Sequence, residues 1–307
     1  MKIFTTLPEH AAEPTVLALG NFDGVHLGHQ QLLRQGLAKA RELNTHFSVL
    51  LFDPHPMKVL FPERKLELLT GKDERLLLFE KMGVDQVFLL PFTMEFANTT
   101  PEEFVEKILM KIGAVHLVVG FNYSFGSHGK GTPADLQKFG QDYHFGVSIV
   151  QAQKFENKVI SSSEIRRYLL HGDIAMAKEM MGRAPTLTGI VGHGDGRGRN
   201  IGFPTANLET DADQLIPKNG VYAVTSVIDG KRYGGMMNIG VRPTFKSDAD
   251  KTIEIYFFDF TGDLYNKKLT IYIEARLRSE KKFSGVEAIV DQLNKDKEHA
   301  KKTLQNI

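Results

Sequence analysis

Between Thr15 and Ala152 the sequence alternates short, almost wholly apolar runs with segments of helical periodicity. The apolar runs are TVLALG, HFSVLLF, QVFLLPF, AVHLVVG and GVSIVQA, and the segments between them include DERLLLFEKMG, PEEFVEKILMKIG and PADLQKFGQDY. Strands that are apolar at nearly every position are buried on both faces, which happens when helices cover both sides of a parallel sheet. We therefore expect an α/β domain of the doubly wound, Rossmann-like type.

The helices of this half have recognisable starts and a recognisable end. Thr132 is followed by Pro133 and Asp135, a pattern typical of an N-cap, a first-turn proline and an acid at the positive helix end. A helical stretch, SSEIRRYLLHGDIAMAKEMMG, closes the half. We place the domain boundary near Arg183 to Pro185, which gives domains of residues 1–184 and 185–307. A length of 307 residues agrees with two domains of roughly 150 residues each.

The second half of the sequence predicts a different pattern of secondary structure. GVYAVTSVI, KRYGGMMNIG, KTIEIYFFDF and KKLTIYIEARL are strand-like and are joined by turn signals, with no long helix between them. This pattern indicates a small antiparallel barrel or sandwich. The final segment, SGVEAIVDQLNKDKEHAKKTL, predicts an amphipathic helix that packs on the barrel with one apolar stripe, formed by Val286, Ile289, Val290 and Leu293.

Composition excludes several classes of protein. The formal net charge of +1 lacks the basic excess that a DNA- or RNA-binding surface needs, so we expect any bound polyanion to be small. The absence of cysteine excludes disulfides, thiolate metal sites and a cysteine nucleophile. The first residues lack the apolar core of a signal peptide, and no apolar run approaches the ~20 residues of a membrane span. We expect a cytoplasmic protein that binds neither nucleic acid nor membrane.

The stretch GNFDGVHLGHQQLL places two histidines where a strand turns into a helix. Ligands of doubly wound sheets bind at the carboxyl ends of the strands, where this loop lies. Glycines at 20, 24 and 28 permit tight turns, and a helix beginning near His29 offers free amides to a phosphate. Two alternatives remain: an incidental pair that caps a helix, and a zinc site, which is disfavoured because no further ligands with recognisable spacing are present.

Several motifs together resemble a known family. HLGH after GNFDG is similar to the H-x-G-H signature of adenylyl- and cytidylyltransferases, and FDPHP, GFNYSFGSHGKG and ISSSEIRRYL follow it in the matching order. GRNIGFPTANLE, GVYAV, MNIGVRPTF and LRSEKKF in the second half resemble a riboflavin kinase. Nearly the whole chain thus resembles the bacterial bifunctional riboflavin kinase/FMN adenylyltransferases, also called FAD synthetases. The resemblance implies a nucleotidyltransferase domain followed by a kinase barrel, with ATP, riboflavin, FMN and FAD as small-molecule partners.

For the first domain the resemblance implies transfer of the adenylyl group of ATP to FMN. His26, His29 and Arg166 are the implied catalytic residues, because they can stabilise charge on phosphate oxygens. The implied ATP contacts are Gly20, Phe22, Asp23, Gly28, Lys130, Ser161 and Ser162. Asn122, where many relatives carry an acid, and His55 are the implied flavin contacts. By themselves, SSSEIRR also fits a helix N-cap, and Lys130 also fits a mobile surface loop.

GSHGKGT needs a separate comparison with the phosphate-binding P-loop. That motif requires a glycine where this chain has Ser124 and a serine or threonine where it has Gly131. The segment is therefore not a P-loop. We interpret it as a flexible wall of the adenylylation site.

For the second domain the resemblance implies transfer of the ATP γ-phosphoryl group to riboflavin. Glu254 is the implied base, although its pattern alone fits a solvated strand residue. Thr205 and Asn207 of PTAN are implied oxygen ligands for Mg²⁺, and alone they fit a turn. Arg197 and Arg199 lie in a glycine-rich segment that resembles a flap over nucleotide phosphates, and further flavin or nucleotide contacts are expected from Arg242 and Arg278.

Three functional hypotheses follow in descending order. The first is a bifunctional enzyme that makes FMN and then FAD, with ATP and Mg²⁺ at both sites. The second is an adenylyl- or cytidylyltransferase for another phosphorylated acceptor, with the barrel only presenting substrate. The third is a flavin- or nucleotide-binding protein without catalysis, which is disfavoured because such a protein needs no base together with a metal site. The sequence does not predict an oligomeric state.

Overall fold

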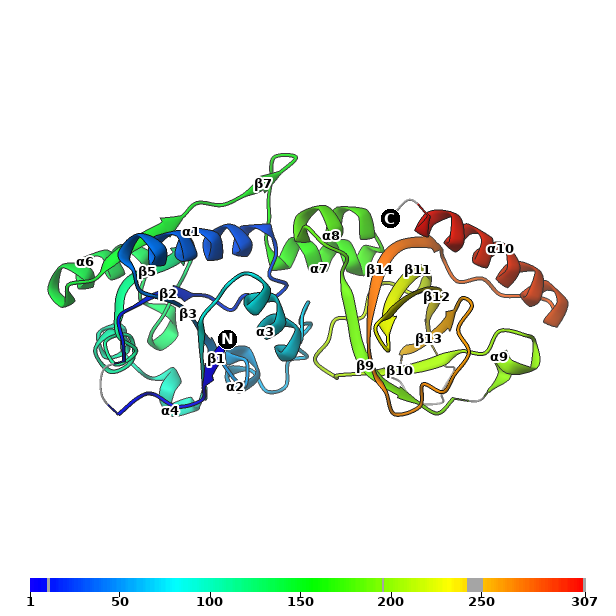
Figure 1. The fold of residues 1–307 in the computed structure, drawn as a ribbon, viewed down its shortest axis with the longest axis horizontal. Helices are drawn as coiled ribbons and strands as arrows, with labels where there is room; N and C mark the ends of the chain where they lie inside the picture. The colour runs from blue at the N-terminus through cyan, green and yellow to red at the C-terminus, as the bar shows by residue number, and fades with distance from the viewer. Residues whose placement is uncertain (10–11, 195, 242–250, 306–307) are drawn as a thin grey trace. The chain divides into compact units, whose positions relative to one another are not determined.

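The chain forms two structural units. The structure, a computed structural model, describes residues 1–9, 12–194, 196–241 and 251–305 (Figure 1). Unit 1 comprises Met1–Leu66 and Lys72–Ser161, and unit 2 comprises Glu67–Gly71 and Ser162–Ile307. The division at Ser161 comes before the helical stretch SSEIRRYLLHGDIAMAKEMMG, which the sequence pattern places in the first domain. The helices that follow Ser161 therefore pack with the barrel.

Unit 1 contains the predicted parallel sheet. Its strands are β1 (Lys2–Phe4), β2 (Thr15–Leu19), β3 (His46–Phe52), β4 (Gln86–Leu90), β5 (Ala114–Gly120) and β6 (Gly146–Val150). They are ordered β1-β4-β3-β2-β5-β6, and every neighbouring pair is parallel. The doubly wound prediction is confirmed. The chain reverses its direction of winding between β2 and β5, which makes the carboxyl ends of these two strands the switch point of the sheet.

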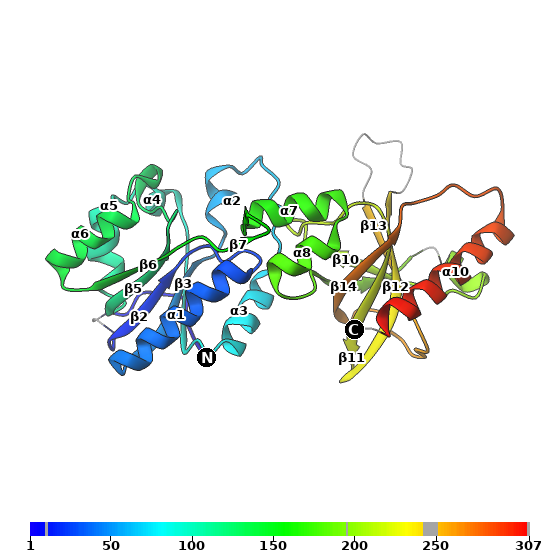
Figure 2. The ribbon, with the colours of Figure 1, turned by 90° about the horizontal axis from the view of Figure 1, so that it is seen from above.

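Helices cover both faces of the sheet, as the apolar strands require. Val16 and Ala18 belong to a core cluster shared with α1 (Leu27–Leu43) and α3 (Lys72–Lys81). Leu17 and Leu19 point to the opposite face and belong to a second cluster. That cluster includes residues of α5 (Pro101–Phe104), the π-helical turn η1 (Val105–Leu109) and α6 (Pro133–Tyr143). Figure 2 shows the two groups of helices on opposite sides of the sheet.

Shorter elements complete unit 1, and the helix starts test the predicted caps. Thr132 and Asp135 form a full capping box at α6, which confirms the predicted start. The prediction that the first helix begins near His29 is two residues late, because α1 begins at Leu27 and His26 is its N-cap. The shorter elements are α2 (Pro56–Leu60), α4 (Met94–Ala97), β7 (Lys154–Phe155) and β8 (Lys158–Val159).

Unit 2 begins with two helices where the sequence pattern suggested one helical stretch. α7 (Ser162–His171) and α8 (Ile174–Met181) are separated at Gly172, whose φ is +81°. Asp173 then caps α8 by accepting a hydrogen bond from the backbone N–H of Met176 at 3.1 Å. A glycine in the left-handed region followed by an aspartate N-cap ends one helix and starts the next.

The rest of unit 2 is a closed barrel with a C-terminal helix. The six strands are all antiparallel and are ordered β10-β13-β12-β11-β14-β9. Their bounds are β9 (Thr186–Gly192), β10 (Ala206–Thr210), β11 (Gly220–Ile228), β12 (Lys231–Val241), β13 (Lys251–Phe257) and β14 (Lys268–Arg278). Of the two predicted alternatives, barrel and sandwich, the structure has the barrel. β9 and β10 were not predicted.

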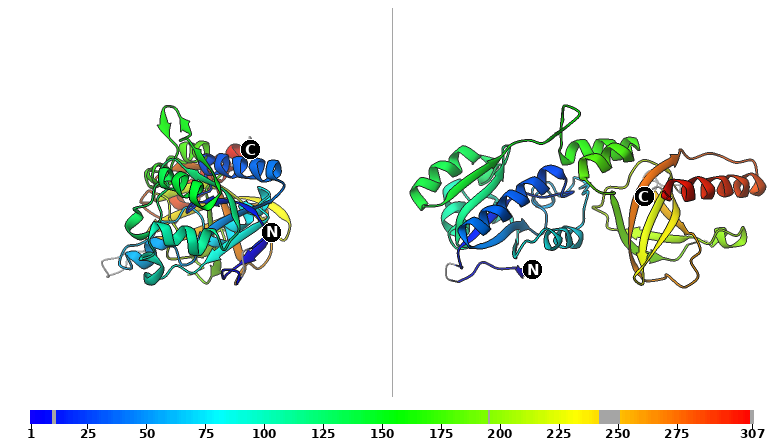
Figure 3. Two further views of the ribbon diagram at one scale, coloured as in Figure 1. Left: turned by 90° about the vertical axis from the view of Figure 1, so that its left-hand side faces the viewer. Right: turned by 45° about the horizontal axis from the view of Figure 1, so that its top comes forward.

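The C-terminal helix α10 (Val286–Leu304) lies against the barrel, and Figure 3 shows it in red beside the strands. Val290 and Leu293 pack with buried Ala300 and with barrel residues, as the predicted stripe requires. Val286 does not belong to that stripe, because its side chain is 61% exposed at the first position of the helix. Asp296 is buried on the packed face and receives two hydrogen bonds from the guanidinium of Arg278, from Nε at 2.9 Å and Nη2 at 2.6 Å.

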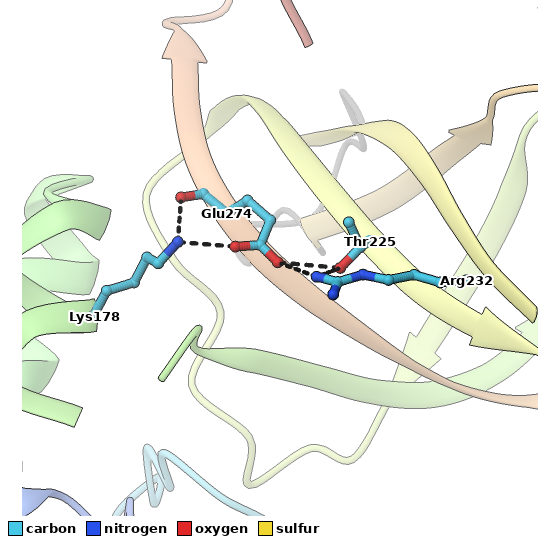
Figure 4. Close-up of polar contacts among 4 residues, drawn as sticks. All are labelled: Lys178, Thr225, Arg232 and Glu274. Atoms are coloured by element: carbon cyan, nitrogen blue, oxygen red, sulfur yellow. Dashed lines mark hydrogen bonds and ion pairs between the residues drawn. The ribbon is translucent and has the colours of Figure 1, made fainter. Parts of the chain in front are cut away.

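A buried carboxylate joins α8 to the barrel (Figure 4). Glu274 of β14 has a side chain that is 3% exposed. Its Oε2 accepts from Nζ of Lys178 on α8 at 2.8 Å, and its Oε1 accepts from Arg232 at 3.2 Å and from Thr225 at 3.1 Å. Burial removes the hydration of this carboxylate, and the three side-chain partners replace it in the folded state. α8 is therefore a part of the barrel unit.

A short segment of the first half also belongs to unit 2. Within Glu67–Gly71, Leu68 donates its N–H to the carbonyl of Asp213 at 2.9 Å and accepts from the N–H of Leu215 at 2.9 Å. The carbonyl of Glu67 accepts a hydrogen bond from Nε of Arg166 at 2.6 Å. The chain thus enters unit 2 for five residues, returns to unit 1, and enters unit 2 again at Ser162.

Candidate active sites

Loops that follow three neighbouring strands of unit 1 lie at one edge of its sheet. The loop of Gly20–His26 follows β2, the FDPHP segment ends β3, and Asn122 comes two residues after β5. Parallel strands end at the same edge, so these segments share the carboxyl edge at the β2–β5 switch point. This is the place where a doubly wound sheet binds its ligand, and it agrees with the predicted position of the histidine loop.

The loop after β2 has an unusual backbone. Phe22 and Val25 have φ values of +50° and +36°, although neither is a glycine, and Gly24 has φ +82°. Left-handed conformations of bulky residues are costly and persist only where the surroundings enforce them. Packing does this here, because Phe22 is fully buried and its ring contacts those of Phe79 and His29 edge-on, with centroids 5.5 and 5.3 Å apart.

The two histidines form one stacked pair at the start of α1. Nδ1 of His26 accepts a hydrogen bond from the backbone N–H of His29 at 3.3 Å, and the ring centroids are 3.7 Å apart. A Cβ at Gly28 would lie 3.2 Å from the ring of His26, so the small residue between the histidines leaves space for the stack. Of the predicted alternatives, the helix-capping one is correct for His26, and it does not conflict with a phosphate site.

The surroundings of His29 favour its neutral form. Burial, and secondly the neighbouring His26, lower the pKa of His29 well below its ordinary value. Nδ1 of His29 is buried and has no hydrogen-bond partner in the part of the chain that the structure describes. Because Nδ1 of His26 accepts a hydrogen bond, the proton of a neutral His26 ring is on Nε2. A neutral imidazole at the start of a helix is suited to donate a hydrogen bond to a phosphate oxygen.

The other predicted residues of this site differ in their surroundings. Asp23 is buried, with 3% of its surface exposed, whereas Asn122 and Lys130 are exposed. His55 caps α2 by accepting a hydrogen bond from the N–H of Met57 at 3.2 Å. Lys130 ends the 3-10 turn η2 (Ser127–Gly129). Gly20 packs against the ring of Phe22, since a Cβ at Gly20 would be 3.3 Å from that ring.

The serine-rich segment spans the division between the units. Ser161 is the last residue of unit 1, and Ser162 and Arg166 belong to α7 in unit 2. The hydrogen bond of Arg166 to Glu67 holds its side chain within unit 2. The structure thus brings His26 and His29 together in one unit and describes Arg166 in the other.

The predicted kinase residues meet on the outer side of the barrel. Thr205 donates from its hydroxyl to Oε2 of Glu254 at 3.4 Å, and Asn207 is opposite Glu254 in the β10–β13 register. Ile253 and Ile255 are buried, whereas Glu254 is partly exposed on the other face, as the alternation predicts. Asn238 is opposite Glu254 on β12. Sequence reasoning missed Asn238, because an amide in a strand is usually a surface residue.

A glycine-rich segment covers these kinase residues. A Cβ at Gly194 would overlap the side-chain amide of Asn207, and one at Gly198 would overlap the carbonyl of Phe203. The backbone therefore approaches the PTAN segment more closely than a larger residue would permit. Arg197 and Arg199 belong to the short helix α9 (Arg197–Asn200) in this segment, and Arg199 is exposed.

Arg242 lies outside the described residues. Arg278 is engaged with Asp296 in the ion pair that joins β14 to α10, and its guanidinium carbon is 6.0 Å from the ring centroid of Phe283. Its predicted contact with flavin is not needed to explain its position.

The described residues lack two further features. No group of three or more histidine, aspartate or glutamate side chains there could hold a metal ion. No helix among them is long and apolar enough to cross a membrane.

Comparisons with known proteins cover the same two halves. A family model described as FAD synthetase matches residues 8–164, and one described as riboflavin kinase matches residues 181–304. A bifunctional riboflavin kinase/FMN adenylyltransferase of Listeria monocytogenes is 42% identical over 92% of this chain and 90% of its own. One of Bacillus subtilis is 36% identical over 99% of this chain and 98% of its own. A crystal structure from Streptococcus pneumoniae, described as a macrolide-efflux protein, is 32% identical, covers 98% of this chain and 99% of its own, and has a TM-score of 0.89.

A doubly wound unit whose histidine loop lies at the carboxyl edge of its sheet, followed by a barrel with a carboxylate beside a threonine, is consistent with a two-domain, nucleotide-dependent transferase. The matches specify which one. The chain belongs to the family of bifunctional riboflavin kinase/FMN adenylyltransferases. It is an enzyme of flavin-cofactor biosynthesis with a riboflavin kinase domain and an FMN adenylyltransferase domain.

Proposed function

We propose that this chain phosphorylates riboflavin to FMN on the barrel and adenylylates FMN to FAD at the carboxyl edge of the parallel sheet. The observation that carries the proposal is that each unit has its own set of polar groups. The stacked His26–His29 pair is in unit 1, and the Thr205–Glu254 contact is in unit 2. The histidine pair proposed for adenylylation and the base proposed for phosphorylation therefore belong to different units.

In adenylyl transfer, a phosphate oxygen of FMN attacks the α-phosphorus of ATP, and pyrophosphate leaves with the electrons of the broken P–O bond. The attacking oxygen is already nucleophilic, so catalysis consists of alignment and stabilisation of charge. His26 and His29 donate hydrogen bonds to the phosphate oxygens, and Arg166, Ser161, Ser162 and Lys130 bind other oxygens in this proposal. Gly20, Phe22, Asp23 and Gly28 shape the loop, and Asn122 and His55 contact the flavin.

In riboflavin phosphorylation, the terminal ribityl hydroxyl attacks the γ-phosphorus of ATP, and ADP leaves. Glu254 accepts the proton of that hydroxyl as the general base. Arg197 and Arg199 close over the phosphates, and Arg242 and Arg278 border the flavin in this proposal. Asn238, opposite Glu254 on β12, orients the same substrate group.

Mg²⁺ is the metal that the kinase residues fit. Thr205 and Asn207 offer neutral oxygen donors next to the carboxylate of Glu254, and hard Mg²⁺ prefers oxygen ligands and takes the rest of its coordination from water and phosphates. When bound, the ion neutralises charge on the ATP phosphates. The protein residues provide the two oxygen ligands and hold the base beside them.

The domain division and the location of the enzyme belong to the proposal as well. We place the functional boundary at 184/185, so that residues 1–184 carry adenylylation and residues 185–307 carry phosphorylation. We place the enzyme in the cytoplasm, because both reactions consume ATP, which is made and spent inside the cell.

A chromatographic time course tests the proposal. Purified protein is incubated with riboflavin, ATP and Mg²⁺, in air and again with reduced flavin. We expect FMN to appear first and FAD later. FMN without FAD under both conditions would contradict the adenylylation half, and no product at all would contradict both halves.

A further inference from the structure

A buried arginine lies beneath the histidine loop. Arg75 of α3 is only 5% exposed, which is rare for an arginine. Its Nη1 donates a hydrogen bond to the backbone carbonyl of Asn21 at 3.0 Å, across 54 residues of sequence. A side chain from the third helix thus holds the backbone of the loop that follows β2.

Two carboxylates balance the charge of this arginine. Burial lowers the pKa of Arg75, and the charges of Asp23 and Asp53 oppose that effect. Asp23, in the histidine loop, is 3% exposed, and Asp53 directly follows β3. The hydrogen bond to Asn21 places the guanidinium against the loop that follows β2. The loops after β2 and β3 both belong to the carboxyl edge at which we place adenylyl transfer.

A second cation at the same edge provides a contrast. Nζ of Lys72 binds the carboxylate of Asp53 at 2.6 Å, and the Lys72 side chain is 47% exposed. Arg75, in comparison, is buried and bonded to the loop itself. The two residues are one helical turn apart on α3, so they form a matched pair of a buried and an exposed cation.

The loop needs such a support. Phe22 and Val25 are held at φ +50° and +36°, and the histidine pair comes directly after them. A strained backbone relaxes when a contact that enforces it is removed. A shift of that backbone would displace His26 and His29 relative to the phosphate that they bind.

We propose that Arg75 is a positioning residue for adenylyl transfer, which acts by holding the backbone of the histidine loop at Asn21. In this proposal it acts through the loop and not on a substrate. The inference rests on the proposed adenylylation site and deepens it: the residues that contact phosphate are placed by a buried cation on a different helix.

The experiment compares Arg75→Lys and Arg75→Met with Lys72→Met as the matched control. For each full-length variant, kcat and KM for ATP are measured with FMN as acceptor, at a temperature where circular dichroism reports the native state. Riboflavin phosphorylation is measured on the same preparation. His29→Ala is included, so that failure of the adenylylation site itself is distinguished from failure of this inference.

We expect Arg75→Met to lower the adenylylation kcat by about 10- to 100-fold, with KM for ATP changed less, because misplaced catalytic groups reduce the rate of the chemical step. Arg75→Lys keeps the charge and should recover part of the loss. Lys72→Met and riboflavin phosphorylation should stay within about twofold of wild type. If Arg75→Met does not fold, the test uses Arg75→Lys. A lowered adenylylation kcat with intact riboflavin phosphorylation in that variant would support the proposal.

Two outcomes would overturn the proposal. One is an unchanged adenylylation kcat in the folded Arg75 variants while His29→Ala is impaired, which would make Arg75 a purely structural residue. The other is an equal loss of both activities, which would indicate a general folding defect. If His29→Ala were also unimpaired, the proposed site itself would be wrong.

Discussion

His29 has the most constrained surroundings of the predicted catalytic side chains. Its ring is stacked on the ring of His26, the N-cap of α1, and contacts the ring of buried Phe22 edge-on. Burial lowers the pKa of His29. A neutral ring is a donor that needs no protonation to bind phosphate oxygens, and it does not repel the cations of the same site. The capping role of His26 and the phosphate role of the pair are therefore compatible.

The substitution His29→Ala tests this role. We expect the rate of FAD formation from supplied FMN to fall by about 10²- to 10³-fold, the effect of removing one donor to developing negative charge. FMN formation from riboflavin should be unchanged. The measurement is a chromatographic assay of both products. His46→Ala is the matched control, because His46 is an exposed histidine of the same unit, paired with Glu13 at 2.9 Å. FAD formation within twofold of wild type in His29→Ala would contradict the assignment.

Glu254 is the corresponding test for the barrel. We expect Glu254→Gln to reduce FMN formation by about 10²- to 10⁴-fold, because the amide cannot accept the ribityl proton. FAD formation from supplied FMN should persist. Glu209→Gln removes an exposed acid from the neighbouring strand β10 and should leave both activities intact. If His29→Ala and Glu254→Gln abolished the same activity in folded protein, the assignment of two separate sites would fail.

Among the helices, α8 shows how a local interaction decides where an element belongs. The periodicity of its sequence predicts a helix and gives no sign of its partner. Lys178 and Glu274 are 96 residues apart, yet their contact makes α8 a part of the barrel unit.

We expect Lys178→Met to destabilise unit 2 by about 1–3 kcal/mol, because it removes a charge-assisted hydrogen bond from the buried carboxylate of Glu274. The hydrogen bond from Arg232 to the same carboxylate remains in this variant. Lys267→Met is the control. It removes an exposed ion pair with Asp229, and should cost at most about 0.5 kcal/mol. Hydrogen exchange of β14 peptides reports the free energy of opening for unit 2. An equal, small effect of both substitutions would show that the buried pair contributes no more than the surface pair.

The strands show why part of the fold was predictable. The central strands of unit 1 are buried on both faces, which leaves an unbroken apolar run in the sequence. β1 has three exposed residues, β10 has only Leu208 buried among its five residues, and β9 contains exposed Ile190, so none leaves such a run. Val286 fits the helical period but lies at the end of α10, beyond the reach of the barrel.

The sites were predictable to a similar degree. The histidine pair is local in sequence, and its family resemblance is specific, so both histidines could be named together. Arg75 could not, because an arginine in a helix is usually a solvated residue and only the fold brings it under Asn21. The ion pair of Arg278 with Asp296 could not be predicted either, because the two residues are 18 positions apart and meet only in the fold.

Taken together, the two units raise the question of which residues are needed for an independent barrel. We expect a fragment of residues 162–307 to unfold at least about 5 °C above a fragment of 185–307, because the shorter one loses the Lys178–Glu274 pair and the buried face of α8. Circular dichroism measures both midpoints, and riboflavin phosphorylation checks that each fragment is native. Equal midpoints would favour a structural boundary at 184/185 over the division at Ser161.

The short excursion of Glu67–Gly71 into unit 2 bears on how such enzymes can be recombined. A crossover at a single point between Ser161 and Ser162 would join the barrel of one parent to residues 67–71 of another. Those residues bond to Asp213, Leu215 and Arg166, so the hybrid would have mismatched partners inside its second half. A functional exchange of the kinase half therefore has to include residues 67–71 as well. The two units are not two consecutive stretches of sequence that can be exchanged at a single point.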